Sequence, residues 1–345
     1  MTAGEYLKIL DGKRGVSGNE ESVRATVCEL FKKYCDEVRC DKLGNVIGKM
    51  CGFDKGAPSV MIEAHIDEIG LMVRGITDCG TLKFITVGGF DPKTLTGTEV
   101  TVHGKKDLFG VIGAVPPHLL TDGGNAPAIS ELCVDIGVFS KEEAQKNISI
   151  GDIITINTDF TPLLNDFVAG RCIDDRGGIA IIMRVMEFLS SQRIANDIYF
   201  VATVQEEVGL RGAKVSAEGI KPDIAIALDV CHGTSSGVTD DAFPCGKGPV
   251  ITIGPNLHRK LTDKMIKIAE ENDISLQKEV CSGNTGTDAW EIQVSSSGVK
   301  TALLSVPLRY MHSNYEVCSL ADLESAARLI SMLAISLKDG DCLCW

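Results

Sequence analysis

The feature that most constrains this chain is a set of short apolar runs separated by helical segments. Four runs have the length and composition of buried strands: 59–65, 198–204, 223–230 and 300–306. Helices are expected at 176–192, near 258–271 and at 320–337. Strands that alternate with helices indicate an α/β fold, in which a mostly parallel sheet is flanked by helices on both faces.

The sequence changes character after the first of these strands. "LKFITVGGF", "GTEVTVHGKKDLFGVIGAV" and "GDIITINTDF" are short β-rich runs broken by Gly, Asp and Pro. We therefore expect residues 70–160 to form a β-barrel-like domain that is inserted into an α/β domain of residues 1–69 and 161–345.

A helix is predicted ahead of the first strand, in the segment "SGNEESVRATVCELFKKY". Ser17 can serve as its N-cap, and Glu20 follows three residues later, which is the pattern of a capping box. We therefore expect these two residues to cap the start of that helix.

The charge and the cysteine content argue against several classes of protein. The 345 residues carry a net charge of −13, whereas nucleic-acid binding needs a basic surface. No apolar run approaches the roughly 18 residues of a membrane span. The 13 cysteines lack paired CxxC spacings, and the first residues lack the apolar core of a secretion signal. We therefore expect a cytoplasmic protein with reduced thiols that binds neither nucleic acid nor membranes.

Polar residues that could carry chemistry follow the predicted strands. In an open α/β sheet, ligands bind outside the carboxyl ends of the strands. The residues delivered to that edge, or to the turn before the helix at 176–192, are His65, Asp67, Asp174, Asp175, Glu206, Glu207, Asp229 and His312. Two histidines and several carboxylates suit Zn²⁺, Co²⁺ or Mn²⁺ better than Cu(I) or an iron–sulfur cluster. The set therefore predicts a metal site at this edge.

Each of these residues also has an ordinary structural interpretation. His65 alone would be a core or surface histidine, and the pair Asp174-Asp175 would cap a helix. Asp229 could cap a loop. The joint placement of several such groups at strand ends favours the metal site. Four further histidines lack comparable neighbours and are expected to be structural or surface residues: His103, His118, His232 and His258.

Glu206 and Glu207 are adjacent at the end of a predicted strand. Successive side chains on a strand point to opposite faces, so neighbouring glutamates need not do the same job. They are either two ordinary solvated acids at the end of a strand or two residues with different tasks at one site.

Six segments of the sequence occur in the order found in a known family. They are "HIDEIGLMV", "RCIDDRGG", "VQEEVGLRGA", "ALDV", "SGNTGTDAWEIQVSSSGVKT" and "PLRYMHSNYEV". With these segments the chain closely resembles the di-metal aminopeptidases that assemble into tetrahedral particles, the glutamyl-aminopeptidase and TET-peptidase family. "DKLGNVIGK" and "ELCVDIGVFSKEEAQKNISIGD" resemble the flanking segments, so the resemblance covers nearly the full chain.

The resemblance implies two divalent metal ions, Zn²⁺ or Co²⁺, with Mn²⁺ as a further possibility. Asp174 would bridge the two ions. His65 and Asp229 would complete the first site, and Glu207 and His312 would complete the second.

The resemblance also implies how the remaining residues act on peptide substrates. Glu206 would be the general base, and Asp67 would orient the histidine of the first metal site. The bond between Asp174 and Asp175 would be cis, as in related peptidases. The insert would hold dimers that assemble into a tetrahedral dodecamer. The stretch 252–261, "TIGPNLHRKL", matches the family poorly and is expected to border the substrate pocket.

Three other functions fit parts of the same pattern. A di-metal deacylase or carboxypeptidase would need a cation for the carboxylate of its substrate, and Arg176, Arg211 and Arg309 are candidates. A glycosidase would need two carboxyl groups that flank the scissile bond, and it has no use for two histidines. In a metal-storage assembly, Glu206 would have no function.

Overall fold

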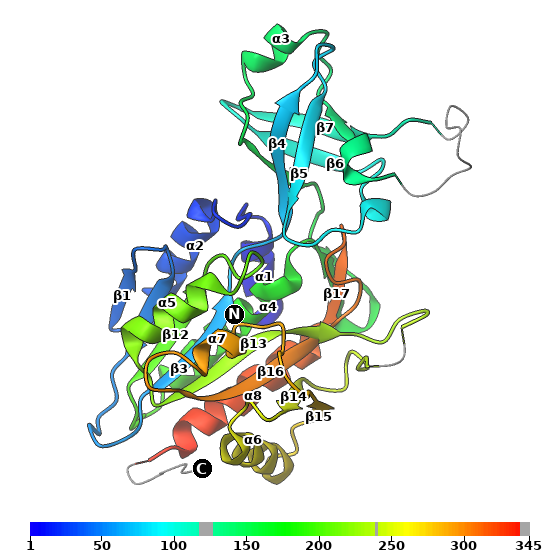
Figure 1. The fold of residues 1–345 in the computed structure, drawn as a ribbon. Coiled ribbons are helices and arrows are strands. Elements are labelled where there is room, and N and C mark those ends of the chain that lie inside the picture. Colours follow the sequence, from blue (N-terminus) through cyan, green and yellow to red (C-terminus); the bar gives the residue numbers. More distant parts are fainter. Residues whose placement is uncertain (117–126, 239–240, 339–345) are drawn as a thin grey trace.

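The computed structural model describes residues 1–116, 127–238 and 241–338, and all statements below concern these residues. An eight-stranded sheet forms the centre of the larger part of the molecule (Figure 1). In spatial order its strands are β1 (Glu37–Cys40), β2 (Val46–Met50), β12 (Ile198–Thr203), β3 (Val60–His65), β13 (Ile224–His232), β16 (Lys300–Leu308), β14 (Val250–Ile253) and β15 (Gln277–Val280).

The centre of this sheet is parallel and its margins are mixed. Strands β12, β3, β13 and β16 run parallel to one another. On one side β2 is antiparallel to both β12 and β1, and on the other β14 is antiparallel to β16. The predicted α/β fold is confirmed, and the parallel strands are those that carry the predicted site.

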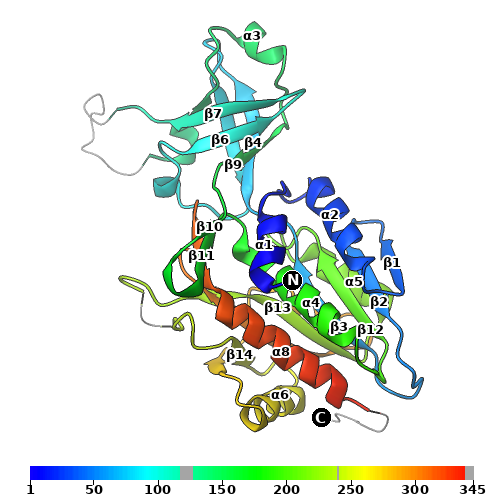
Figure 2. The ribbon, with the colours of Figure 1, turned by 180° about the vertical axis from the view of Figure 1, so that it is seen from behind.

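Helices cover both faces of the sheet because side chains alternate along each strand. In β3, Val60 and Ile62 belong to a large core on one face, whereas Met61 belongs to a second core on the other. The first face is covered by α1 (Ala3–Asp11), α2 (Glu21–Phe31), α4 (Ile173–Leu189), α6 (Arg259–Glu271) and α8 (Leu320–Ser336) (Figure 2). The second face is covered by α5 (Arg211–Ile220) and α7 (Ala289–Ile292). No described helix is both long and apolar enough to cross a bilayer.

The β-rich insert is a closed barrel with a core of its own. Its strands, in order around the barrel, are β4 (Gly70–Ile76), β5 (Leu82–Val87), β8 (Cys133–Asp135), β7 (Asp107–Gly113), β6 (Glu99–His103) and β9 (Ile153–Ile156). Leu71, Leu82 and Val100 are fully buried in a cluster that is separate from both cores of the sheet. The barrel stands away from the sheet, and the chain enters it soon after β3 (Figure 1).

A small third sheet lies where the chain returns from the barrel. It consists of β10 (Thr161–Pro162), β11 (Phe167–Gly170) and β17 (Glu316–Ser319). Because β11 leads into α4 and β17 leads into α8, this sheet places Glu316 beside the start of α4. The short helix α3 (Lys141–Gln145) belongs to the barrel region.

The predicted capping box is wrong. Helix α2 begins at Glu21, and its N-cap residue, Glu20, makes no side-chain cap. The side chain of Ser17 instead donates a hydrogen bond to the carboxylate of Asp67, at 2.5 Å. A buried carboxylate needs donors, and that demand outweighs the local capping pattern.

Candidate active site

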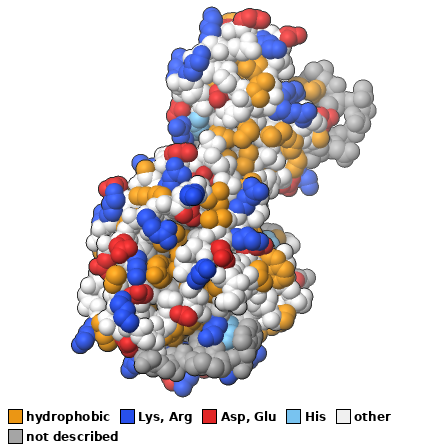
Figure 3. All heavy atoms as spheres, turned by 60° about the vertical axis from the view of Figure 1, so that its left-hand side comes forward, with side chains coloured by type: hydrophobic (Ala, Val, Ile, Leu, Met, Phe, Trp, Pro, Cys, Tyr) orange, Lys and Arg blue, Asp and Glu red, His pale blue; other side chains and the backbone are white. Residues whose placement is uncertain are grey.

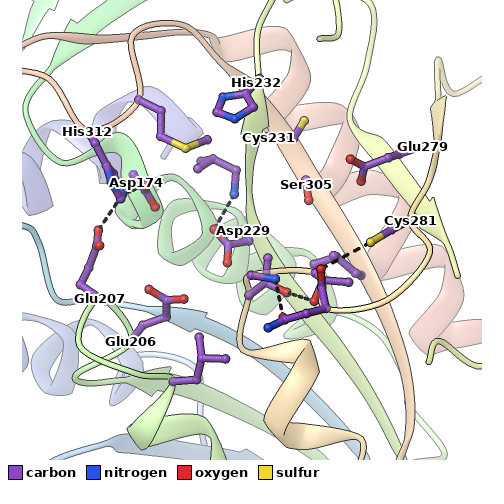
Figure 4. Close-up of a pocket in the computed structure, with 18 of the residues that line it drawn as sticks. Asp174, Glu206, Glu207, Asp229, Cys231, His232, Glu279, Cys281, Ser305 and His312 are labelled. Atoms are coloured by element: carbon purple, nitrogen blue, oxygen red, sulfur yellow. Dashed lines mark hydrogen bonds and ion pairs between the residues drawn. The ribbon is translucent and has the colours of Figure 1, made fainter. Parts of the chain in front are cut away.

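Six of the predicted site residues meet at the carboxyl edge of the sheet, and all of them except His65 line one cavity (Figure 4). They are His65 at the end of β3, Asp174 in the first turn of α4, Glu206 and Glu207 after β12, Asp229 in β13, and His312 beyond β16. Segments that are distant in the sequence therefore come together where the parallel strands end. The peptide bond between Asp174 and Asp175 is cis, as expected.

The carboxylate of Asp174 lies between the two histidines. Its Oδ1 is 3.1 Å from Nε2 of His65, and its Oδ2 is 3.3 Å from Nε2 of His312. Two groups with metal-binding geometry share this aspartate: His65, Asp174 and Asp229 form one, and Asp174, Glu207 and His312 form the other. A carboxylate that presents one oxygen to each of two ligand groups has the arrangement needed to bridge two cations.

The ring of His65 is fixed by its other nitrogen. Nδ1 lies 3.1 Å from the backbone carbonyl of Asp67. A carbonyl can only accept a hydrogen bond, so Nδ1 donates to it, and Nε2 is the nitrogen that faces Asp174, to which it donates as long as no metal is bound. This is the ring orientation that a metal ligand requires.

The carboxylate of Asp67 holds the two glutamates. It accepts hydrogen bonds from the backbone N–H of Glu206 at 3.0 Å and of Glu207 at 3.2 Å. Strand β12 ends at Thr203, and Gln205 has a positive φ of 59°, so the glutamates lie in a turn rather than on the strand. Strand alternation is therefore not the reason that they face different partners. The turn and Asp67 set their directions.

A second buried carboxylate, that of Glu316, does the same for the opposite side of the site. Its two oxygens accept from the backbone N–H of Asp174 at 3.0 Å and of His312 at 3.2 Å. Glu316 was not among the residues predicted from the sequence. The only available signal was an acid four residues after His312 in "HSNYE". Each of these two buried carboxylates thus anchors the backbone of two predicted site residues.

The charges of the site are those of a cation-binding cluster. In the metal-free protein, burial is the main cause that raises the pKa of Asp229 well above its usual range and that of Glu206 to about 9. Hydrogen bonds with Asp174 and Glu207 raise the pKa of His312 to about 11. Burial opposes ionisation of Asp174, but hydrogen bonds with both histidines hold its pKa below the usual range. Crowded buried carboxylates are costly unless cations compensate them, so the donor set fits a pair of divalent ions.

The cavity of about 580 Å³ continues from this cluster along the sheet edge to β15. The far end of the cavity was not predicted from the sequence; it includes Glu279, Cys281 and the loop 284–287. The strand β15, "QKEV", has no apolar run that would have revealed it. His232, expected to be a structural or surface residue, is exposed and lines the cavity. No described lining residue comes from 252–261, but Thr252, the first residue of this stretch, donates a hydrogen bond to the lining residue Glu279.

The three arginines considered as receptors for a substrate carboxylate lie elsewhere. The guanidinium of Arg176 is fully buried and pairs with Glu68 at 3.0 Å. Nε of Arg309 donates to the backbone carbonyl of Thr234 at 2.9 Å. Neither of these two nor Arg211 is among the described residues that line the cavity.

Two of the other histidines have structural contacts. His103, in the barrel, lies 2.9 Å from the carboxylate of Asp107. Nδ1 of His258 accepts a hydrogen bond from the backbone N–H of Leu261 and caps α6. His118 lies outside the described residues.

Comparison with solved structures defines the class of protein. An aminopeptidase from the archaeon Desulfurococcus kamchatkensis matches with a TM-score of 0.91 and 38% identity, over 97% of this chain and 95% of its own. The TET1 peptidase of Pyrococcus horikoshii, which can assemble into a tetrahedron or a large octahedral shell, matches with a TM-score of 0.86 and 37% identity. That match covers 97% of this chain and 100% of the other. The fold is therefore that of the TET aminopeptidases.

Comparison of sequences identifies the family. The family model of the M42 glutamyl aminopeptidases matches residues 44–329. The lysyl aminopeptidase of Pyrococcus furiosus is 38% identical over 348 residues, which is 99% of this chain and 99% of the relative. The chain belongs to the M42 peptidase family and is a peptide hydrolase. The resemblance drawn from the six sequence segments is confirmed.

Proposed function

We propose that this protein is a dinuclear metallo-aminopeptidase that removes N-terminal residues from peptides. The observation that carries the proposal is the position of Asp174, whose two oxygens face two histidines that belong to separate ligand groups. The aminopeptidases to which the chain is similar over its whole length support the same reaction.

The ligand groups divide between two ions. His65, Asp174 and Asp229 would hold the first ion, and Asp174, Glu207 and His312 would hold the second. Imidazole and carboxylate donors suit Zn²⁺ or Co²⁺, and Mn²⁺ also fits them. When bound, such a pair of ions polarises the peptide carbonyl and makes the attacking water more acidic.

We assign the movement of the proton to Glu206. It is 9% exposed and forms a third possible ligand group with His65 and Glu207, but it belongs to neither of the two groups that share Asp174. A general base must take the proton of the attacking water and later pass it to the leaving amine. The backbone N–H of Glu206 donates a hydrogen bond to the carboxylate of Asp67, which fixes the backbone from which the Glu206 side chain extends. Asp67 is therefore a positioning residue, both for the base and for His65.

The competing functions find less support at this site. A deacylase or carboxypeptidase needs a cation for the substrate carboxylate, and the described part of the cavity wall contains no Lys or Arg. A glycosidase mechanism leaves the two histidines without a task. A metal-storage protein has no use for an open cavity of about 580 Å³ beside the ligands.

The test is a comparison of substrates with and without metal. Protein stripped by a chelator should not hydrolyse aminoacyl-p-nitroanilides, and Zn²⁺, Co²⁺ or Mn²⁺ should restore the activity. The corresponding N-acetylated compounds should remain uncleaved, because an aminopeptidase requires a free amine. Hydrolysis that survives chelation, or a preference for N-acetylated amino acids, would contradict the proposal.

For the insert, residues 70–160, we propose a role as the dimerisation domain of a cytoplasmic homo-oligomer, a tetrahedral dodecamer built from dimers. Hydrophobic side chains gather on the surface of the barrel (Figure 3). Phe109 and Val111 point outward from β7 and are 58% and 37% exposed. Patches of this kind mark contact surfaces. Phe109→Asp with Val111→Asp should reduce the mass measured by analytical ultracentrifugation; an unchanged mass would count against this surface.

A further inference from the structure

The far end of the cavity contains a carboxylate that the proposed chemistry does not use. Glu279 lies on β15, at the margin of the sheet, and faces the cavity from the side opposite Glu207 and His312 (Figure 4). Cys231 and Ser305 lie between the two sides (Figure 4). A peptide whose N-terminal amine is held at the ligand cluster would extend its first side chain into this space.

Glu279 is held in place by a buried hydroxyl. The side chain of Thr252, which is inaccessible to solvent, donates to Oε2 of Glu279 at 2.7 Å. No described cation pairs with Glu279. The lysine next to it on β15, Lys278, is exposed and reaches Glu270 on α6 instead. The second oxygen of Glu279 therefore remains available to a ligand.

The negative charge of Glu279 acts on the interior of the cavity. Burial is the main cause that raises the pKa of the Cys231 thiol well above its usual range, and the charge of Glu279 raises it further.

The cavity as a whole is acidic. Six carboxylates line it, those of Asp174, Glu206, Glu207, Asp229, Asp241 and Glu279, and no described lining residue is Lys or Arg. Two divalent ions would bring four positive charges against these six negative ones, so the metal-loaded cavity still attracts a cation. A glutamate side chain would meet repulsion here and no partner.

The walls between the cluster and Glu279 are suited to a long aliphatic chain. Four apolar residues contribute to the lining of the cavity: Leu303, Val230, Leu210 and Met311. Lysine combines a four-carbon stem that packs on apolar surface with a terminal charge, and arginine resembles it. A wall that offers apolar surface along part of its length and a carboxylate at its far end matches these two side chains.

We infer that the cavity selects peptides with a positively charged N-terminal residue, lysine or arginine, and that Glu279 binds the charge of that side chain. The inference rests on the proposed aminopeptidase function and specifies its substrate class. Asp241, exposed on the cavity wall, adds to the attraction without the support of a buried partner.

The experiment compares lysyl and norleucyl substrates, because norleucine has the stem of lysine without the ammonium group. With metal-loaded protein, kcat/KM for the lysyl 7-amido-4-methylcoumarin should exceed that for the norleucyl compound about tenfold or more, and glutamyl should be the poorest. Glu279→Gln should lower the lysyl value about tenfold, mainly through KM, and leave the norleucyl value within about twofold. Ground-state binding of a remote charge is expected to affect KM in this way.

Two further variants act as controls. Glu270→Gln removes the same charge from an exposed position on α6 outside the cavity. It should leave kcat/KM unchanged for both the lysyl and the norleucyl substrate. Glu279→Lys should shift the preference toward the glutamyl substrate. The inference is overturned if the wild type prefers norleucyl or glutamyl substrates, or if Glu279→Gln lowers lysyl and norleucyl values equally, as a structural role would. If the metal-loaded protein cleaves norleucyl but not lysyl substrate, the inference fails alone; if it cleaves no aminoacyl substrate, the proposed function fails with it.

Discussion

The two ends of the active-site cavity are built differently. At the cluster end, the side chains come from parallel strands and the start of α4, and Asp67 and Glu316 each hold the backbone of two of them. At the far end, Glu279 lies on a short marginal strand and depends on one hydroxyl, that of Thr252. The groups proposed to react thus lie where buried carboxylates hold the backbone. The group proposed to select the substrate lies at the margin of the sheet, where one residue can change without disturbing the core.

The largest effect is expected from the two neighbouring glutamates, because they separate chemistry from metal binding. Glu206→Gln should retain both ions and lose kcat by about 10²–10⁴-fold, the range of a general base. Glu207→Gln should lose part of the bound metal, because we assign Glu207 to the ligands of the second ion. Both predictions are checked by measuring the metal content, by mass spectrometry, and kcat on the same samples. A Glu206→Gln protein with full activity would show that the base is another residue.

A smaller effect is expected from the two carboxylates that anchor the site. Asp67→Asn replaces a charged acceptor of three hydrogen bonds with an amide that cannot accept all of them. We expect metal affinity to fall about 10–100-fold, as for other residues that orient ligands. Glu316→Gln should behave similarly, chiefly at the ion held by Asp174 and His312. Asp107→Asn, at an exposed carboxylate of the barrel, is the control and should leave the affinity unchanged.

Protons should compete with the metal ions. Hydrogen bonds raise the pKa of His312 to about 11 in the metal-free protein, so both ring nitrogens carry a proton at neutral pH. Metal binding must release one of these protons. The apparent affinity should therefore rise with pH, up to about tenfold per unit for each proton released. Calorimetric titrations in buffers of different ionisation enthalpy measure the released protons. Binding without proton release would contradict the position assigned to this histidine.

The smallest effect is expected for the coupling between the two ends of the cavity, because they should act independently. Residues in separate hydrogen-bond networks usually contribute additively. In the double variant Asp67→Asn with Glu279→Gln, the loss in kcat/KM for the lysyl substrate should equal the product of the two single losses. For the norleucyl substrate the double variant should match Asp67→Asn alone. A strong departure from additivity would show that one network spans the whole cavity.

Sequence patterns predict the cluster end well and the far end poorly, for physical reasons. Buried parallel strands leave apolar runs in the sequence, and the strand-end rule then points to His65 and Asp229. A short marginal strand such as β15 leaves no such run, and Glu279 is an ordinary acid in the sequence. The anchoring role of Glu316 depends on a contact between β17 and α4 that no local pattern reveals. Ser17 was misassigned because a long-range acceptor, Asp67, competes with the local cap.

The central claim is that Asp174 bridges two cations. Anomalous diffraction from crystals loaded with Zn²⁺ or Co²⁺, collected at the absorption edge of the metal, tests it most directly. We expect two peaks per chain, about 3.5–4 Å apart. One should lie beside His65 and Asp229 and the other beside Glu207 and His312, with Asp174 between them. A single peak, or two peaks that do not both contact Asp174, would contradict the account.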